Sequence, residues 1–423
     1  MRAAAWFCAV LTANFTLRPL RDAMGVAAGS DALPWLFTAT FVAMLVVVPI
    51  HGRLVARLGR ARLVAVVHRG FAVQLLGFYV LLAGHLDPLF ATWLSAPELV
   101  HLWTARVLFV WTSVFNLIVI SLFWSVMADL FTAADARRLF GLISVGGSVG
   151  AIAGPALGGL LAWRLGVAWV PVVAALLLEL AVWAGRGLDP GPGELEVAEH
   201  PREPSPIGGG AWDGVRELLG SPLLLGICAY VLLLTVASTT VYFVQARVIA
   251  AEFVDDRTRT SVFAAIDLAV NLTSVAAQAL LTARMIRRIG LGWTLAALPC
   301  LCAVGFVGLA AAPVLATLVG FQLVRRASDY ALARPAREAL YTAVDRSRRF
   351  KAKLLIDTVV YRGGDALTGW AFAGLEAVGL SLAAVALAVV PLMGAWAGLG
   401  VWLGRTADAR SVADLDPEAG EDR

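Results

Sequence analysis

Long apolar runs separated by short polar stretches recur along the whole chain. A helix needs about 20 apolar residues to cross the hydrocarbon core of a bilayer, which is about 30 Å thick. Segments of this kind begin near residues 3, 33, 63, 100, 140, 165, 222, 260, 291, 312, 354 and 378, and six of them fall in each half. The pattern predicts an all-α polytopic membrane protein, with twelve transmembrane helices in two six-helix, pseudo-symmetric halves.

The two halves share sequence. The stretch MADLFTAADARRLF at 127–140 returns 210 residues later as REALYTAVDRSRRF, with six of fourteen positions identical. A second pair, GRLVARLG at 52–59 and ARMIRRIG at 283–290, lies nearer the start of each half. Repetition at a fixed offset indicates a duplicated multi-helix unit, and duplicated membrane halves are typical of transporters.

The stretches between and after the halves differ in composition. Residues 186–221 are rich in Pro, Gly and Glu without an apolar period, which predicts a cytoplasmic linker. The predicted domains are an N-terminal half at 1–185 and a C-terminal half at 222–404, and the acidic residues 405–423 are expected to form a disordered tail. The first segment lacks a small-x-small cleavage site, which favours an uncleaved span over a signal peptide.

Composition places the chain in a bilayer, because 60% hydrophobic and 15% charged residues leave too little polar surface for a water-soluble globule of 423 residues. Arginines gather in alternate loops, such as Arg53 with Arg57 and Arg284 with Arg287. Those loops, and with them both termini, are predicted to be cytoplasmic. The basic residues behind the net charge of +4 therefore indicate the orientation of the chain in the membrane, and nucleic acid is not expected as a partner. The four cysteines have neither zinc-site nor disulfide-framework spacing.

Glycines recur every fourth residue in the fifth segment, at 146, 150, 154 and 158. They form a flat stripe that lets another helix approach closely, and we expect it to let the halves slide against each other. Pro155 weakens the hydrogen-bond ladder locally. Residues 146–150 also spell G-x-S-x-G, but a nucleophile elbow needs a preceding strand, so an intramembrane protease is not favoured. The helix-packing motif comprises Gly150, Gly154, Pro155, Gly158 and Gly159.

This glycine spacing resembles the fifth-helix antiporter motif of the major facilitator superfamily. GRLVARLGRAR at 52–62 is similar to that superfamily's loop motif between helices two and three, with Ala56 where the motif often carries Asp. The resemblance implies a major facilitator fold, whose two halves rock around a central cavity.

A closer resemblance is to the ATP/ADP translocase family and its free-living bacterial relatives. It is carried by LRPLRDAMG at 17–25, SLFWSVMADLFTAADARRLFG at 121–141 and KAKLLIDTVVYRGGDALTGW at 351–370. The resemblance implies nucleotide exchange. Arg21 occupies the position of a first-helix Lys that serves nucleotide binding in that family, and residues 362–365 correspond to its eleventh-helix segment.

Ionisable residues at membrane depth are costly and are functional candidates by default. An arginine guanidinium binds phosphate or carboxylate through a planar fork. The candidate substrate-binding residues are therefore Arg18, Arg21, Arg106 and Arg362, joined by Tyr361. The alternative is that these arginines snorkel to the span ends.

Acidic residues at membrane depth are candidates for coupling. Helical spacing places Asp357, Tyr361 and Asp365 near one face, while Asp267 lies four residues before Asn271. Either face can carry a coupling proton, and hydrogen bonding between helices is the alternative. Arg325 and Asp329, four residues apart, can also close a structural bridge within the tenth segment.

The repeated loops carry a candidate gate. Asp135 and Arg138 in the first copy match Asp345 and Arg348 in the second. We expect these pairs to latch the cytoplasmic face.

The expected function is secondary active transport by alternating access, as an antiporter of small anionic metabolites such as nucleotides. The alternatives are a proton-coupled exporter of organic or drug-like solutes, and a membrane receptor or scaffold that moves nothing. Without a Walker A, metal-binding or dinucleotide motif, no enzyme activity and no cofactor are expected. The expected setting is the cytoplasmic (inner) membrane, with the chain as a monomer.

Overall fold

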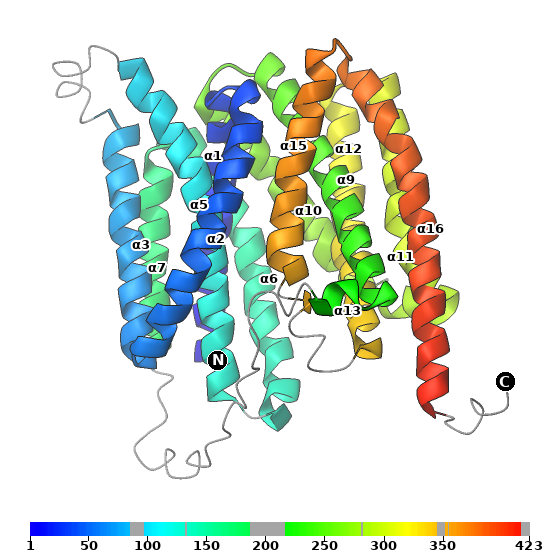
Figure 1. Ribbon diagram of the computed structural model, residues 1–423. Helices are drawn as coiled ribbons and strands as arrows, with labels where there is room; N and C mark the ends of the chain where they lie inside the picture. The colour runs from blue at the N-terminus through cyan, green and yellow to red at the C-terminus, as the bar shows by residue number, and fades with distance from the viewer. Residues whose placement is uncertain are drawn as a thin grey trace. The chain divides into compact units, whose positions relative to one another are not determined.

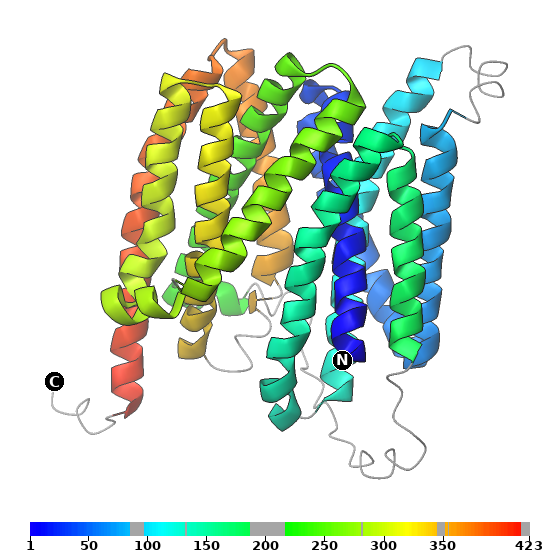
Figure 2. The same ribbon diagram turned by 180° about the vertical axis from the view of Figure 1, so that it is seen from behind.

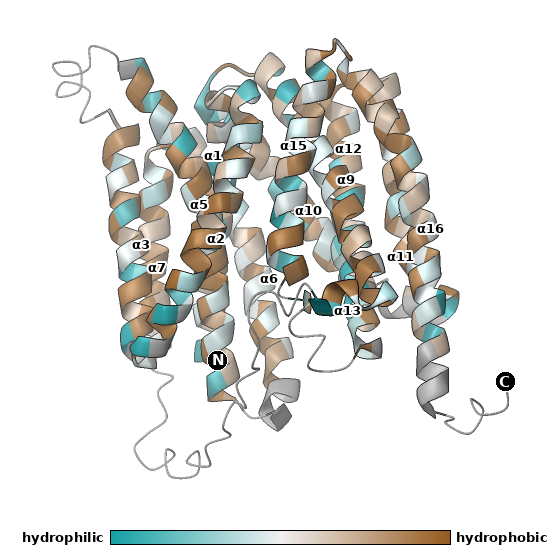
Figure 3. Cartoon of the chain, in the orientation of Figure 1, coloured by the Kyte–Doolittle hydropathy of each residue, from teal (hydrophilic) through white to brown (hydrophobic). Residues whose placement is uncertain are grey.

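The computed structural model describes residues 1–84, 97–131, 133–186, 216–280, 282–344, 352–353 and 355–415, and these residues contain helices and no strands (Figure 1). Hydrophobic residues run along each of the helices (Figure 3). The chain divides into two compact units. Unit 1 comprises Met1–His200 with Ile249–Asn271, and unit 2 comprises Pro201–Val248 with Leu272–Arg423.

Unit 1 is built on the first six long helices of the chain. These are α1 (Arg2–Ala27), α2 (Leu33–Arg57), α3 (Arg60–Leu82), α5 (Pro97–Leu130), α6 (Ala133–Arg164) and α7 (Trp169–Arg186), with the short turn η1 (Ser30–Ala32) between α1 and α2. The first part of α10 (Asp256–Leu280), as far as Asn271, also belongs to this unit. Helix α1 contacts α5, α6 and α7, and its Phe7 ring stacks on Phe123 of α5 with 4.3 Å between centroids. The first segment is therefore a core element of unit 1.

Unit 2 contains the remaining long helices. These are α9 (Pro222–Glu252) as far as Val248, α11 (Thr282–Ala311), α12 (Leu315–Ser328), α15 (Tyr361–Ala377) and α16 (Leu382–Leu415). The unit also contains α10 from Leu272 onward, the short helix α13 (Arg334–Leu340) and the 3-10 turn η3 (Tyr341–Ala343) after it. Two π-helical segments interrupt the regular helices. One, η2 (Asp329–Ala333), joins α12 to α13, and the other, η4 (Ile356–Val360), leads directly into α15. Such π segments occur often at functional sites.

The predicted transmembrane segments are confirmed as helices. Over the described residues, nine helices are long and apolar enough to cross a membrane. The segments outside that group are α1, α12 with α13, and α15. They carry the ionisable residues Arg18, Arg325 and Arg362, or are divided by the π segments.

The sequence repeats occupy equivalent connections in the two halves of the chain. The first copy of the long repeat runs from the end of α5 into α6, and the second copy begins in α13 and continues through η3. The shorter repeat joins α2 to α3 and forms the start of α11, where Gly290 breaks the helix with φ +78°. This φ favours glycine, because L side chains rarely adopt it.

The glycine stripe of α6 lies against α1 (Figure 2). A Cβ atom added at Gly150 would lie 2.5 Å from the Cys8 carbonyl oxygen, and one added at Gly158 would lie 2.7 Å from that of Thr16. The Thr16 hydroxyl also donates a hydrogen bond to the Gly154 carbonyl oxygen at 3.1 Å. The stripe thus lets two helix backbones of the same unit meet. Because α1 fills it along its length, the prediction that the stripe lets the halves slide against each other is wrong.

Candidate functional site

Helix α1 carries a cation that is paired across unit 1. The Nε atom of Arg18 lies 3.4 Å from Oδ2 of Asp267 on α10. The arginine side chain is 31% exposed, whereas the aspartate is only 5% exposed. The nearly buried aspartate therefore holds the guanidinium in place, while part of the arginine side chain stays accessible.

Arg21 lies one turn further along α1 and shows the same asymmetry. Its Nη1 atom is 3.3 Å from Oδ1 of Asp22, and its guanidinium lies over the ring of Phe109 on α5, 4.2 Å from the centroid. The arginine side chain is 18% exposed and that of Asp22 is 8% exposed. The aromatic ring adds a cation–π contact that orients the guanidinium.

The second polar position of α10 has a packing role. The Asn271 side-chain amide donates a hydrogen bond to the Ala151 carbonyl oxygen of α6 at 2.6 Å. Of the two polar residues, Asn271 therefore makes the helix-to-helix hydrogen bond, and Asp267 makes the ion pair with Arg18.

In unit 2, Asp365 joins α15 to α9. The Thr239 hydroxyl donates to its Oδ1 atom at 2.8 Å, and Nη1 of Arg362 lies 3.5 Å from Oδ2. The close approach depends on Gly364, since a Cβ atom there would collide with the Thr235 hydroxyl. Arg362 is 29% exposed and Asp365 is 9% exposed, so the arginine again presents the accessible side of the pair.

The predicted bridge between Arg325 and Asp329 is wrong. Asp329 pairs with Arg334, whose Nε atom lies 3.2 Å from Oδ2. The physical reason is the π segment that begins at Asp329, because its i→i+5 hydrogen bonds bring the residue five positions later to the same side. The i, i+4 rule therefore does not apply here.

Arg325 instead forms a buried polar chain with two glutamines. Its guanidinium donates to the Gln322 side-chain oxygen at 2.8 Å, and the Gln322 amide donates to that of Gln245 on α9 at 2.6 Å. Each of the three side chains is at most 7% exposed. The sequence pattern does not indicate that these three side chains lie together. The available signal was two glutamines inside apolar segments.

The other predicted residues of the eleventh segment lie within its π segment and in the helix that follows it. Asp357 is exposed within η4, and Tyr361 begins α15, where its ring centroid lies 5.6 Å from the Arg362 guanidinium carbon. Tyr361 and Asp365 both lie in α15 and keep the i, i+4 spacing. Asp357 lies in η4, where this spacing does not hold, so regular helical geometry does not place it on their face.

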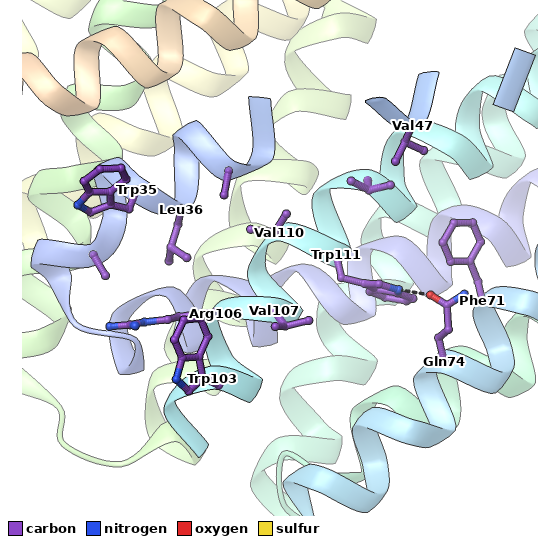
Figure 4. A pocket seen from close by; sticks show the side chains of 13 residues that line it. Trp35, Leu36, Val47, Phe71, Gln74, Trp103, Arg106, Val107, Val110 and Trp111 are labelled. Atoms are coloured by element: carbon purple, nitrogen blue, oxygen red, sulfur yellow. Dashed lines mark hydrogen bonds between the residues drawn. The ribbon is translucent and has the colours of Figure 1, made fainter. Parts of the chain in front are cut away.

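Arg106 lies apart from these pairs, in a groove between α2, α3 and α5 (Figure 4). Its guanidinium lies 5.1 Å from the ring centroid of Trp103. No acid lies within ion-pair distance of it among the residues that the structure describes.

The predicted latch lies largely outside the described residues. Asp345 and Arg348 fall in 345–350, and the side chains of Asp135 and Arg138 are likewise not described. Among the described residues, no group of three or more metal-ligating side chains lies together.

The family model described as Major Facilitator Superfamily matches residues 3–324 of the chain. The sequence has no significant match among curated proteins. Solved structures match over nearly the whole length. The nucleoside transporter NupG is 13% identical, with a TM-score of 0.60, covering 97% of this chain and 99% of that chain.

Two further structures are similar. A bacterial homologue of the iron transporter ferroportin, in an inward-facing state, is 12% identical with a TM-score of 0.61, covering 93% of this chain and 98% of that chain. A bacterial homologue of the human lysosomal transporter Spinster is 14% identical with a TM-score of 0.52, covering 98% of both chains. At these identities the similarity concerns the fold alone, and the predicted fold class is confirmed.

Proposed function

The chain belongs to the major facilitator superfamily, and on that premise we propose that it exchanges small anionic metabolites across the membrane by alternating access. It is a multi-pass membrane transporter rather than a typical enzyme. The finer assignment, an antiporter of anions with nucleotides first among them, is argued from the ion pairs and from the resemblance of residues 17–25 to the nucleotide exchangers.

One observation supports the proposal that the substrate is an anion. In the pairs of Arg18, Arg21 and Arg362, the arginine is 18–31% exposed and its acid is 5–9% exposed. A guanidinium has five N–H donors in a planar fork, and a partly exposed guanidinium can offer donors to a ligand. The accessible side of each pair is therefore positive and rich in donors, which suits phosphate or carboxylate.

The second candidate function is proton-coupled export of organic solutes. It is favoured by Asp267 and Asp365, which are nearly buried and each paired with one arginine. Protonation of such an acid would release its arginine, and the release would link a proton to a conformational change.

The first test is a thermal-shift panel on detergent-purified protein with ATP, ADP, other nucleotides, organic phosphates and cationic dyes, followed by exchange in liposomes for each hit. We expect a nucleotide to stabilise the wild type and to lose its effect on Arg21→Glu, because charge reversal repels an anion. Arg69→Glu is the matched control. Arg69 also pairs with an acid, Glu179, at 2.6 Å, but it lies on α3.

The two functions give different outcomes. Loss of the nucleotide response in Arg21→Glu alone supports anion exchange. Silence for every anion, with a response to dyes that survives Arg21→Glu, would replace it with the proton-coupled exporter.

Orientation and setting belong to the same proposal. We place both termini in the cytoplasm of a cell with the protein in its inner membrane, because arginines gather in the alternate loops. A reporter fused to each terminus tests this placement, and activity of both reporters on the outer side would reverse it. The chain is proposed to act as a monomer, which size-exclusion chromatography with light scattering can check.

A further inference from the structure

A groove of about 860 Å³ runs along unit 1 between α2, α3 and α5 (Figure 4). Its walls are mainly apolar, with Leu36, Val107 and Val110 among the lining residues. Arg106 and Trp103 lie toward one end, while Phe71, Gln74 and Trp111 lie toward the other. The side-chain oxygen of Gln74 accepts a hydrogen bond from the Trp111 indole N–H at 2.5 Å.

Among the described residues that line this groove, Arg106 is the one cation. Its Nε atom is buried and has no hydrogen-bond partner among the described residues, and no carboxylate there lies within 4.0 Å of it. The Trp103 ring provides a cation–π contact, which does not neutralise the charge. A charged group in an apolar setting is costly until an anion pairs with it.

The position of Arg106 corresponds to the polar boundary of a bilayer. Helix α5 has 34 residues, hence a length of about 51 Å, and a centred helix extends about 10 Å beyond a hydrocarbon core of about 30 Å at each end. Arg106 follows the start of α5 at Pro97 by about 13 Å and therefore lies just inside the boundary. Trp35 and Trp103, 64% and 55% exposed, lie at the same end, as interfacial aromatic residues do.

The groove has the length of one leaflet. From Trp103 to Val114, helix α5 rises about 16 Å, which compares with about 15 Å for half of the hydrocarbon core. The side of α2 away from the core is apolar and exposed, at Val42, Val46 and Ile50. An extended hydrocarbon chain can thus contact apolar side chains both inside the groove and on the exposed face of α2.

We propose that this groove binds an anionic phospholipid of the surrounding bilayer. One acyl chain lies along α2 and α5, and the phosphate pairs with the Arg106 guanidinium. Arg106 is then a lipid-binding residue, separate from the paired arginines Arg18, Arg21 and Arg362. The inference does not depend on which solute the protein transports.

Native mass spectrometry of the purified full chain tests the site, with phosphatidylglycerol and phosphatidylcholine as the lipid probes. The wild type should retain phosphatidylglycerol in preference to phosphatidylcholine. Arg106→Gln should lower phosphatidylglycerol binding about fivefold, the usual contribution of one basic residue near an anionic lipid surface. Arg106→Lys should keep most of the preference, and Ala39→Trp, which fills the groove, should reduce binding of both lipids.

Arg69→Gln is the matched control, because Arg69 is 50% exposed on α3, does not line the groove and pairs with Glu179. It should bind phosphatidylglycerol as the wild type does. Equal retention by Arg106→Gln and wild type, or an equal loss in Arg69→Gln, would overturn the lipid site. Displacement of the lipid by millimolar inorganic phosphate would also overturn it, because the site would then recognise a soluble anion. Loss of the nucleotide thermal shift in Arg106→Gln with lipid retention unchanged would return Arg106 to the substrate site.

Discussion

Replacement of Gly150 by alanine tests the contact between α6 and α1 most directly. The added Cβ atom would lie 2.5 Å from the Cys8 carbonyl oxygen and 3.0 Å from the Thr12 backbone nitrogen. Ordinary contact between such atoms is about 3.5 Å, so the helices must separate by roughly 1 Å. Both obstructing atoms belong to the backbone of α1, and rotation of a side chain cannot relieve the collision.

The expected cost follows from overpacking. Inserting a methyl group into a close-packed contact costs about 1–3 kcal/mol, and exchange of glycine for alanine in a helix returns about 0.5–1 kcal/mol. Gly150→Ala should therefore destabilise the protein. Gly141→Ala is the matched control in the same helix, since a Cβ atom there has nothing within 4 Å, and it should stabilise the protein slightly.

The assay unfolds the purified protein in mixed micelles with increasing amounts of SDS. Tryptophan fluorescence monitors the fraction of unfolded protein. The two variants should shift the midpoint in opposite directions. An unfolding free energy for Gly150→Ala at or above that of the wild type would refute the close backbone contact. An equal loss in Gly141→Ala would show that the effect belongs to glycine replacement in general. Because α1 carries Arg18 and Arg21, Gly150→Ala should also weaken the proposed nucleotide response.

Three further predictions concern charged residues. Asp267→Asn removes a nearly buried acid from its pair with Arg18 and leaves that arginine, 31% exposed, without this partner. It should cost about 1–3 kcal/mol of stability, the usual cost of a lost buried polar contact. The pH dependence of exchange in liposomes should change if this acid carries the coupling proton. Asp255 lies outside the spans and accepts a hydrogen bond from the Thr258 backbone N–H at 2.8 Å, which lowers the pKa of its carboxyl below the usual value of 3.8. The stabilisation from this hydrogen bond should be complete above pH 3.8 and should disappear as the pH falls through the lower pKa of the folded state. Thermal unfolding of Asp255→Ala against the wild type at pH 7 and pH 3 checks this, and a difference that grows on acidification would contradict it. Replacement of Asp135 and Asp345 together by asparagine should disturb the closed cytoplasmic face, and unchanged transport in that double variant would remove the latch.

Much of the fold was predictable because membrane insertion leaves a strong one-dimensional signal. A helix that crosses a bilayer must satisfy its own backbone hydrogen bonds and cover itself with apolar side chains. The predicted segments near 33 and 222 begin at the observed starts of α2 and α9, and the segment near 260 begins four residues after that of α10. The first copy of the long repeat runs from α5 into α6, and the described part of the second copy lies in α13 and η3.

The charge pairing was less predictable, because it depends on where helices meet and on their local pitch. Regular spacing predicted a pair between Arg325 and Asp329. Instead, the π segment η2 brings Asp329 next to Arg334, and these two residues form the ion pair. The pair of Arg18 and Asp267 joins residues 249 positions apart, and no sequence period can indicate such a contact. The buried Gln322 accepts a hydrogen bond from the Arg325 guanidinium, and a sequence cannot tell which amide faces which cation.

By itself, the sequence determined that the chain is a multi-pass membrane protein, and it predicted that the halves are duplicated and which ionisable residues lie at membrane depth. These properties depend on hydrophobic length and residue type, which are local. Only the tertiary structure decided that α1 fills the glycine stripe of α6 and that Arg106 lines an apolar groove. It also decided that Arg18, Arg21 and Arg362 are partly exposed and pair with acids that are nearly buried. Those properties depend on distances of a few ångströms between helices far apart in sequence, which packing alone sets.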